Sequence, residues 1–441
     1  MTSTSKTVVH KPAHKKTPHA SPVPQPTTGG SPSEFRLRAY QVGFGDCFLL
    51  SFKYPDVSRH VLIDFGTVKL PPDATGDYML RIAQDIKAQC GSDGLTAVVE
   101  THRHRDHISG FTSQNDQDSG GIIRNLKPQL VMQPWTEDPN AAVDAQGPTA
   151  SATAQAFVAS LQDMHAFSAR AALEAQRFQQ RDVPGAQELG FIGDNNLTNE
   201  SAVKNLMSMG NAHEYLFCGA TTQLGNLLPG VKVHVLGPPT LKQSSAIKNE
   251  STTNASEFWQ LAATTARNVD AQPCFDASTE WKGDYPPSLR WFIEHADSVR
   301  SDQSLGLVRI LDKAMNNTSI ILLFEIAGKR FLFPGDAELE NWQYALSLDA
   351  CKALLSGVDF YKVGHHGSRN ATPKSMWAQL KGGKHDDLQT VVSTLSHVYG
   401  QEDKHTEVPR SSLLQELRQN STFYSTEGQH DLAHEITFTF S

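Results

Sequence analysis

The sequence lacks the features of a membrane or secreted protein. Its 441 residues contain no apolar run of the roughly 18 residues that a membrane-spanning helix needs. Residues 1–33 are rich in Lys, Pro, Ser and Thr and have no apolar core of a secretory signal. We therefore predict no membrane span, a cytoplasmic location, and a disordered basic and proline-rich tail over residues 1–34. A weak docking arm is the alternative interpretation of the tail.

Cysteine and positive charge are also scarce. The five cysteines are dispersed and have no CxxC spacing, which excludes a disulfide framework and fits a reducing compartment. The formal net charge of −8 argues against a surface that coats nucleic acid, although it does not exclude a nucleic-acid substrate held at a metal site. No P-loop and no convincing Ser-His-Asp set is present, so any chemistry must come from other residues.

Short apolar strands alternate with helical patterns along much of the chain. Helices are expected at 78–91, 337–355 and 411–419. Strands are expected at 35–43, 47–52, 60–66, 95–101, 129–134, 231–239, 359–368, 388–396, 422–426 and 435–440, and two more strands within 318–336, joined by a turn at Gly328. This alternation predicts an α/β layered fold.

Two long segments, about 137–229 and 241–312, interrupt the alternation. The first is rich in Ala and Gln and includes a helical pattern over 197–210, with Thr198 or Asn199 as its N-cap. We predict that both are helical cap insertions over one face of a single hydrolase domain, residues 35–441. A separately folding domain is the alternative.

The stretch THRHRDH, residues 101–107, follows an apolar strand. In an extended segment, residues i and i+2 point to the same side, so His102 and His104 can chelate one ion. Asp106 and His107 lie at the turn into the next helix and can face a neighbouring ion. Imidazole and carboxylate groups suit zinc or another first-row divalent metal. A solvated polar loop is the alternative.

Three further residues occupy equivalent positions at the ends of apolar strands. They are Asp64, Asp336 and His365, and a glycine lies close to each of them in the sequence. Ligand-binding groups gather at strand ends in layered α/β sheets. Asp336 is a candidate for a carboxylate that bridges two ions, and His365 for a ligand of the second ion. Two divalent ions can activate water near neutral pH without a cysteine or serine nucleophile.

The order of these motifs resembles that of the metallo-β-lactamase-fold hydrolases, above all the branch that contains the catalytic domain of the DNA-uptake protein ComEC. The HxHxDH loop is the most specific element, and the similarity covers residues 35–136, 230–240 and 315–441. The corresponding motifs here are VGFGD (42–46), IDFG (63–66), HRHRDH (102–107), VLGPP (235–239), NNTS (316–319), PGD (334–336) and KVGHHGS (362–368).

This resemblance implies a four-layer αββα sandwich with two divalent ions at one edge, zinc first and manganese as the alternative. It assigns His102 and His104 to the first ion and Asp106 and His107 to the second, with Asp336 bridging them.

The resemblance also implies roles around the ligands. Asp64 is expected to orient the metal-binding loop from behind. His365 is expected to bind the second ion, because it directly follows the strand; His366 is the alternative ligand, or acts on the substrate. Ser368 and Arg369 are candidates for contacts to a phosphate.

The chain departs from the family pattern at one strand. Many members carry a further histidine for the first ion there, where this sequence has Gly237. We therefore expect the first ion to be held loosely, with solvent completing its coordination. The segment KHTEVP (404–409) resembles a histidine-containing loop of the same branch, which makes His405 a catalytic candidate beside Asp106 and His366; an exposed loop histidine is the alternative.

The expected function is that of a dinuclear-metal-dependent hydrolase that uses a metal-activated water, with a phosphodiester as first substrate class. That substrate is a nucleotide, a nucleic acid or a phosphorylated headgroup. The acidic charge and the lack of basic–aromatic clusters favour a small or single-stranded substrate. Hydrolysis of a lactone, thioester or amide is the enzymatic alternative. A metal-binding interaction module, with the cap insertions as its surface for a protein partner, is the alternative without turnover.

Overall fold

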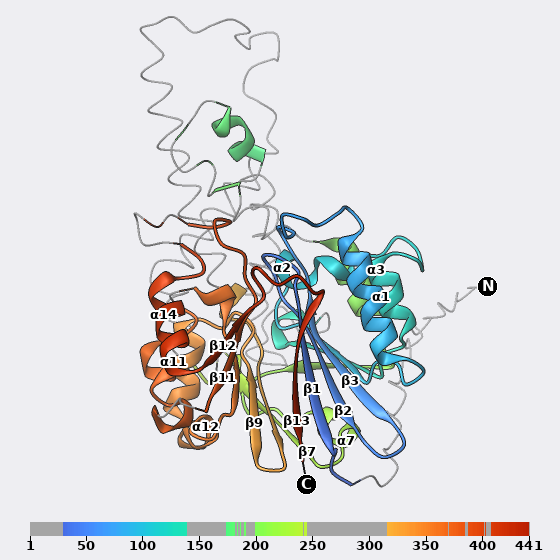
Figure 1. Cartoon of the computed structure of the whole chain (residues 1–441), viewed down its shortest axis with the longest axis vertical. Coiled ribbons are helices and arrows are strands. Elements are labelled where there is room, and N and C mark those ends of the chain that lie inside the picture. Colours follow the sequence, from blue (N-terminus) through green and yellow to red (C-terminus); the bar gives the residue numbers. More distant parts are fainter. Residues whose placement is uncertain are drawn as a thin grey trace, which may run out of the picture.

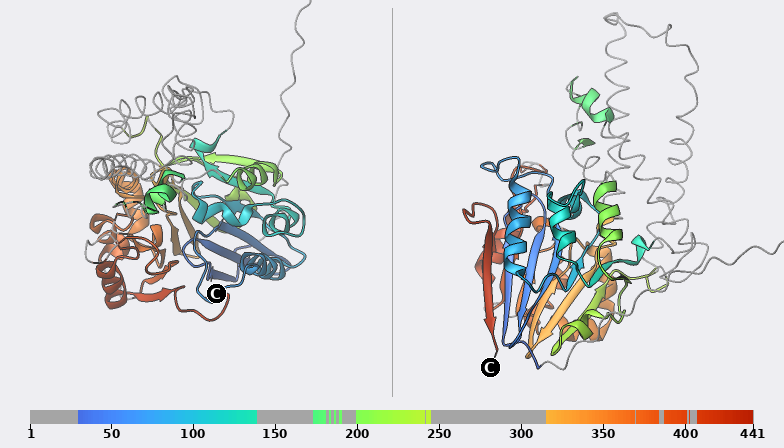
Figure 2. Two further views of the ribbon diagram at one scale, coloured as in Figure 1. Left: turned by 90° about the horizontal axis from the view of Figure 1, so that it is seen from above. Right: turned by 90° about the vertical axis from the view of Figure 1, so that its right-hand side faces the viewer.

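Two mixed β-sheets pack face to face in the computed structural model, and helices cover the outer face of each (Figures 1 and 2). The predicted α/β layered arrangement is confirmed at this level. The structure describes residues 30–138, 173–180, 183, 186, 189–190, 199–240, 242–244, 315–368, 370–383, 387–400, 402 and 407–440. Most of the predicted tail and of both insertions lies outside these residues.

The first sheet has the strand order β13-β1-β2-β3-β4-β5-β6. Strands β13, β1, β2 and β3 pair antiparallel, whereas β3 to β6 pair parallel. Six of the eight residues of β3 are buried, as expected for a strand covered on both faces. The strands are Glu34–Tyr40 (β1), Cys47–Lys53 (β2), Ser58–Phe65 (β3), Ala97–Val99 (β4), Leu130–Pro134 (β5), Ala212–Leu216 (β6) and Ala433–Thr439 (β13).

The second sheet has the order β12-β11-β10-β9-β8-β7. Strands β9 to β12 pair parallel, and β7, β8 and β9 pair antiparallel. The β8–β9 hairpin turns at Ala327 and Gly328, whose φ values of 48° and 82° suit a tight two-residue turn. The strands are Val231–Gly237 (β7), Ile321–Ile326 (β8), Lys329–Phe333 (β9), Phe360–Lys362 (β10), Gln389–Val392 (β11) and Thr422–Ser425 (β12).

Helices pack on both outer faces through apolar stripes. Those on the first sheet are Tyr78–Cys90 (α1), Ser119–Asn125 (α3) and Glu200–Ser208 (α6), and those on the second are Leu339–Ser347 (α11), Asp349–Leu355 (α12), Lys374–Trp377 (α13) and Ser411–Asn420 (α14). The expected helix over 337–355 is thus divided at Leu348, which is extended. The described part of the chain also contains short helical turns, at Arg105–Ile108 (α2), Leu224–Leu227 (α7), Ser109–Phe111, Trp135–Glu137, His365–Gly367 and Leu380–Gly383.

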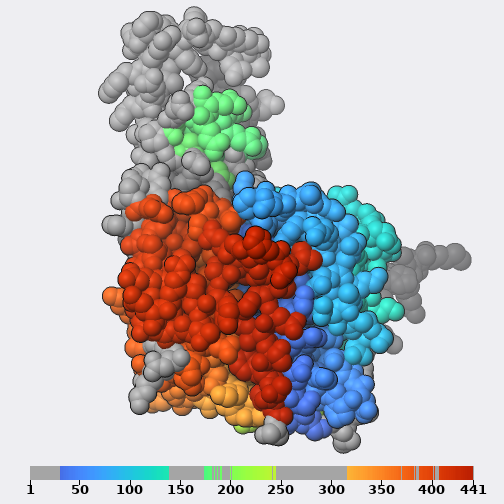
Figure 3. All heavy atoms as spheres, in the orientation of Figure 1, coloured from blue at the N-terminus to red at the C-terminus, as the bar shows by residue number. Residues whose placement is uncertain are grey.

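The core between the sheets is rich in aromatic side chains. Phe35 of the first sheet and Phe331 of the second have ring centroids 4.3 Å apart, and both are fully buried. This packing holds the two halves of the chain together; Figure 3 shows them in contact over one face, blue to cyan against orange to red. Among the described helices, none is long and apolar enough to cross a bilayer.

The first predicted insertion is too long at its C-terminal end. Residues 199–229 belong to the sandwich, because β6 pairs with β5 along its full length and α6 packs on the first sheet. Asn199 caps α6 by accepting a hydrogen bond from the Ala202 N–H at 3.1 Å, as one of the two predicted caps. The edge strand AHEYL escaped detection because its central residues are polar or half-buried and show no apolar run.

A buried histidine in β3 predicts a pH dependence of stability. Burial lowers the pKa of His60 to about 4, and its Nδ1 lies 2.9 Å from Ser51 Oγ. The unfolded chain therefore binds this proton at a higher pH than the folded chain, so the contribution to stability is full above about pH 6.5 and is lost as pH falls towards 4.

We expect His60→Gln to reduce the loss of unfolding free energy between pH 7 and pH 5 by about 2 kcal/mol. Urea denaturation at both pH values measures this difference, with His430→Gln at an exposed position as the control. Equal pH slopes for wild type and His60→Gln would contradict the prediction.

Candidate metal centre

The predicted ligands meet at the edge of the sandwich where parallel strands of both sheets end. Asp64 lies at the end of β3, and the segment 101–107 follows β4. Asp336 follows β9, and the His365–Gly367 turn follows β10. Because the sheets face each other, these ends come together: Asp106 Oδ2 and His366 Nε2, 260 residues apart in the sequence, lie 2.9 Å apart.

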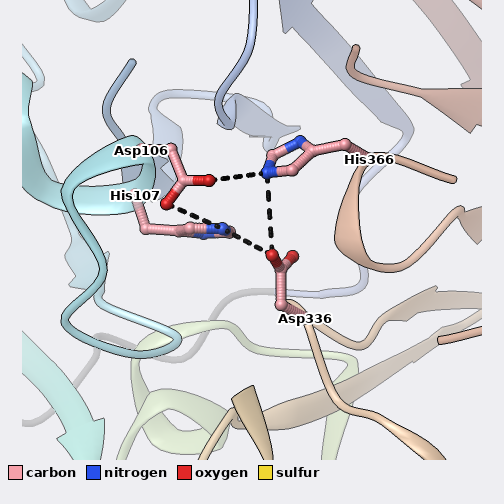
Figure 4. Close-up of side chains that lie close together, drawn as sticks. All are labelled: Asp106, His107, Asp336 and His366. Carbon is pink, nitrogen blue, oxygen red and sulfur yellow. Dashed lines mark hydrogen bonds and ion pairs between the residues drawn. The ribbon is translucent and has the colours of Figure 1, made fainter. Parts of the chain in front are cut away.

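Four buried residues form the centre, as Figure 4 shows: Asp106, His107, Asp336 and His366. Each offers one ligand atom, and these four atoms all lie within 4.8 Å of one another. Asp336 Oδ2 is 3.1 Å from His107 Nε2 and 3.6 Å from His366 Nε2. The structure therefore brings together the two residues and the bridging carboxylate predicted for the second ion.

The histidine that lies within this group is His366, the alternative to the expected His365. His366 is fully buried, and its Nδ1 lies 3.0 Å from the Ser393 carbonyl oxygen, which directs Nε2 into the centre. The His365 side chain is 20% exposed. Both residues have positive φ, 43° and 50°, so the backbone turns sharply and the position directly after the strand is not the one that points inward.

Asp64 contacts both His107 and the residue that begins the predicted metal-binding loop. Its Oδ2 lies 2.8 Å from His107 Nδ1, and its oxygens accept hydrogen bonds from the N–H and Oγ1 of Thr101. A carboxylate on Nδ1 fixes the tautomer and leaves Nε2 for a metal ion. Gly66 is required here, because a Cβ at that position would lie 2.5 Å from the carbonyl carbon of Asp106.

His102 and His104 form a second pair beside this group. Both are buried, and His102 Nε2 lies 2.9 Å from His104 Nδ1, as the i, i+2 spacing predicts. The rings of His102 and His107 have centroids 4.2 Å apart, so the pair directly adjoins the four-residue group. Burial lowers the pKa of His102 well below its usual value, and neutral imidazole is the form that binds a metal.

The charges of the centre are strongly coupled. Burial raises the pKa of Asp336, but His107 and His366 outweigh burial and hold this pKa well below its usual value. His107 and His366 likewise lower the pKa of Asp106 to about 2 against the effect of burial. Burial lowers the pKa of His107, but the carboxylates around it, Asp336 foremost, hold it well above its usual value. The carboxylates thus stay ionised and attract a cation.

These residues fit a divalent metal ion. His107 Nε2 is buried and makes no well-aligned hydrogen bond to any described group, although it faces Asp336 and Asp106. The nearby donors are imidazole nitrogens and carboxylate oxygens, the set that zinc and manganese accept. A cation at this point would satisfy that nitrogen and replace the charge of its proton.

Sequence reasoning missed two charged residues behind the centre. Lys362 forms a buried ion pair with Asp46, lies 3.5 Å from Asp336 Oδ1, and donates a hydrogen bond to the Gly335 carbonyl. Burial lowers the pKa of Lys362, but Asp46 and Asp336 outweigh it, so the ammonium stays charged. Both residues stand in the motifs VGFGD and KVGHHGS; Asp46 immediately precedes β2, whose start lies at the same edge as the end of β3.

Of the three remaining predicted residues, the structure describes only Ser368. Ser368 is buried, its N–H donates to the His365 carbonyl at 2.8 Å, and its Oγ has no hydrogen-bond partner in the described part of the chain. Arg369 and His405 lie outside the described residues.

The assignment of a function therefore depends on the geometry and charge of this centre. No protein-family model and no curated protein matches the chain.

Proposed function

We propose that the protein is a dinuclear-metal-dependent hydrolase with the metallo-β-lactamase fold, and that it cleaves a phosphodiester. The main support for this proposal is the buried group of Asp106, His107, Asp336 and His366. Segments that follow strands of both sheets supply its residues, and it adjoins the His102–His104 pair. So many ionisable side chains are costly to bury together unless a cation compensates them.

The residues divide into ligands and supports. Asp106, His107, Asp336 and His366 would hold one ion, and His102 and His104 would hold the other together with Asp336. Bound divalent ions would supply a water of lowered pKa and would stabilise the attacking and leaving oxygens of the displacement. Asp64 orients the imidazole of His107, and the Ser393 carbonyl orients that of His366.

Thiol chemistry is a poor alternative at this centre. Cys47 follows Asp46 directly, but burial, together with the charges of Asp64 and Asp46, raises the pKa of its thiol well above the usual value. A protonated, fully buried thiol is not a nucleophile. The nucleophile is therefore assigned to water.

The choice of a phosphodiester comes from the resemblance of the motifs to the ComEC branch and is an argument by analogy. Ser368 supports it, because its hydroxyl is buried and has no hydrogen-bond partner among the described residues. Such a hydroxyl can donate to a phosphate oxygen.

We expect the protein to hydrolyse bis-p-nitrophenyl phosphate, to lose this activity to background after chelation, and to regain it with zinc or manganese. A thioester and a lactone probe are assayed in parallel, with metal content measured on the same samples. Faster cleavage of either carboxyl derivative would replace the phosphodiester by that substrate class. Bound metal without turnover of any probe would favour the interaction module.

A further inference from the structure

His365 lies beside the centre without belonging to the four-residue group. Its Nε2 is 3.9 Å from Asp336 Oδ2, the same oxygen that His366 Nε2 approaches to 3.6 Å. The His365 N–H also donates to Asp336 Oδ1 at 3.1 Å, which fixes the turn to the bridging carboxylate. Two consecutive imidazoles thus face the carboxylate of Asp336. Of the two, only His366 has a nitrogen within 4.8 Å of the ligand atoms of Asp106, His107 and Asp336.

A second carboxylate lies behind His365. Glu338 is 4% exposed, and its Oε1 is 3.4 Å from His365 Nδ1. The side-chain amide of Asn316 donates to the same oxygen at 3.3 Å. Asp64 and His107 show the same order, a carboxylate on Nδ1 and Asp336 facing Nε2. A metal-binding histidine commonly has a carboxylate facing its second nitrogen, and Glu338 and His365 lie in that order.

The end of β7 carries Gly237, where many members of the resembled family have a further histidine for the first ion. A Cβ at Gly237 would collide with Asn341 Oδ1 and would lie 2.9 Å from Ile321 Cδ1, so a side chain there would require both of these side chains to move. Asn341 is buried and held by a hydrogen bond from its amide to the Ser319 carbonyl at 3.0 Å. A donor for this ion must therefore come from another element.

We propose that His365 supplies this donor, so that His102, His104 and His365 hold the first ion and share Asp336 with the second. Glu338 is then the positioning residue of His365. The inference rests on the proposed dinuclear centre and names its third imidazole. It predicts that consecutive residues of one turn serve two different ions.

Cobalt titration of the metal-depleted protein tests this assignment, with d–d absorption and bound equivalents as readouts. We expect His365→Ala to weaken one of the two equivalents by at least about tenfold, and Glu338→Gln to weaken the same one less. The double variant His102→Ala/His365→Ala should keep the other equivalent at wild-type affinity. His365→Ala/His366→Ala should weaken both equivalents.

The proposal is overturned if His365→Ala leaves both affinities unchanged, or if His102→Ala/His365→Ala loses both equivalents, which would put His365 on the second ion. A wild-type protein that binds no cobalt would remove the dinuclear centre itself and is thereby distinguishable. His430→Ala, at an exposed site, is the control; circular dichroism and the milder His365→Gln variant separate loss of a ligand from loss of folding.

Discussion

Replacing Asp336 with alanine is expected to remove most of the bound metal and to reduce hydrolysis by more than about a hundredfold. Loss of a residue that only supports a metal ligand costs up to about a hundredfold, and loss of a shared ligand should cost more. The reason is its central position: Oδ2 lies 3.1, 3.6 and 3.9 Å from nitrogens of His107, His366 and His365. In the proposed centre Asp336 is the ligand that the two ions share, so its loss would weaken both sites.

Plasma mass spectrometry of the purified protein measures the metal content, and the phosphodiester assay measures the activity. Asp349→Ala is the matched control, because that aspartate is on α12 with its side chain 98% exposed. We expect about two equivalents of metal in wild type and control. Full metal content in Asp336→Ala would show that this carboxylate is not a shared ligand.

Lys362→Met is expected to destabilise the metal-free protein by roughly 3–5 kcal/mol. Lys362 is 2% exposed and lies between the carboxylates of Asp46 and Asp336. Methionine has a similar shape but no charge, so the variant leaves Asp46 buried without its counter-ion. A saturating divalent ion restores positive charge and binds only the folded state, so the deficit should shrink when metal is present.

Urea denaturation with and without zinc measures both effects. Lys352→Met provides the control, since its ion pair with Asp349 on α12 is exposed and worth less than about 1 kcal/mol. A destabilisation as small as that of the control, or one that metal does not change, would show that Lys362 does not balance the charge of the centre.

Local patterns predicted much of the site. The i, i+2 spacing of His102 and His104 places their nitrogens in contact, because the segment is extended after β4. The rule that functional groups gather at strand ends located Asp64 and Asp336, because β3 and β9 each belong to a parallel set of strands whose carboxyl ends share one edge.

Features that depend on non-local contacts could not be predicted. The pairing of Lys362 with Asp46 joins residues from different sheets, and no local pattern specifies it. The choice between His365 and His366 depends on two left-handed backbone conformations that L-residues seldom adopt in succession. The strand β6 was hidden because an edge strand with polar central residues lacks the apolar run of a buried strand.

The wide separation of the ligands along the chain has a consequence for folding kinetics. The contact between Asp106 and His366 closes a loop of 260 residues, and contacts of this range form late because their entropy cost precedes any gain. A cation that binds only after both sheets have docked stabilises the native state and not the transition state. If the centre binds metal as proposed, the ion would slow unfolding and leave the folding rate largely unchanged.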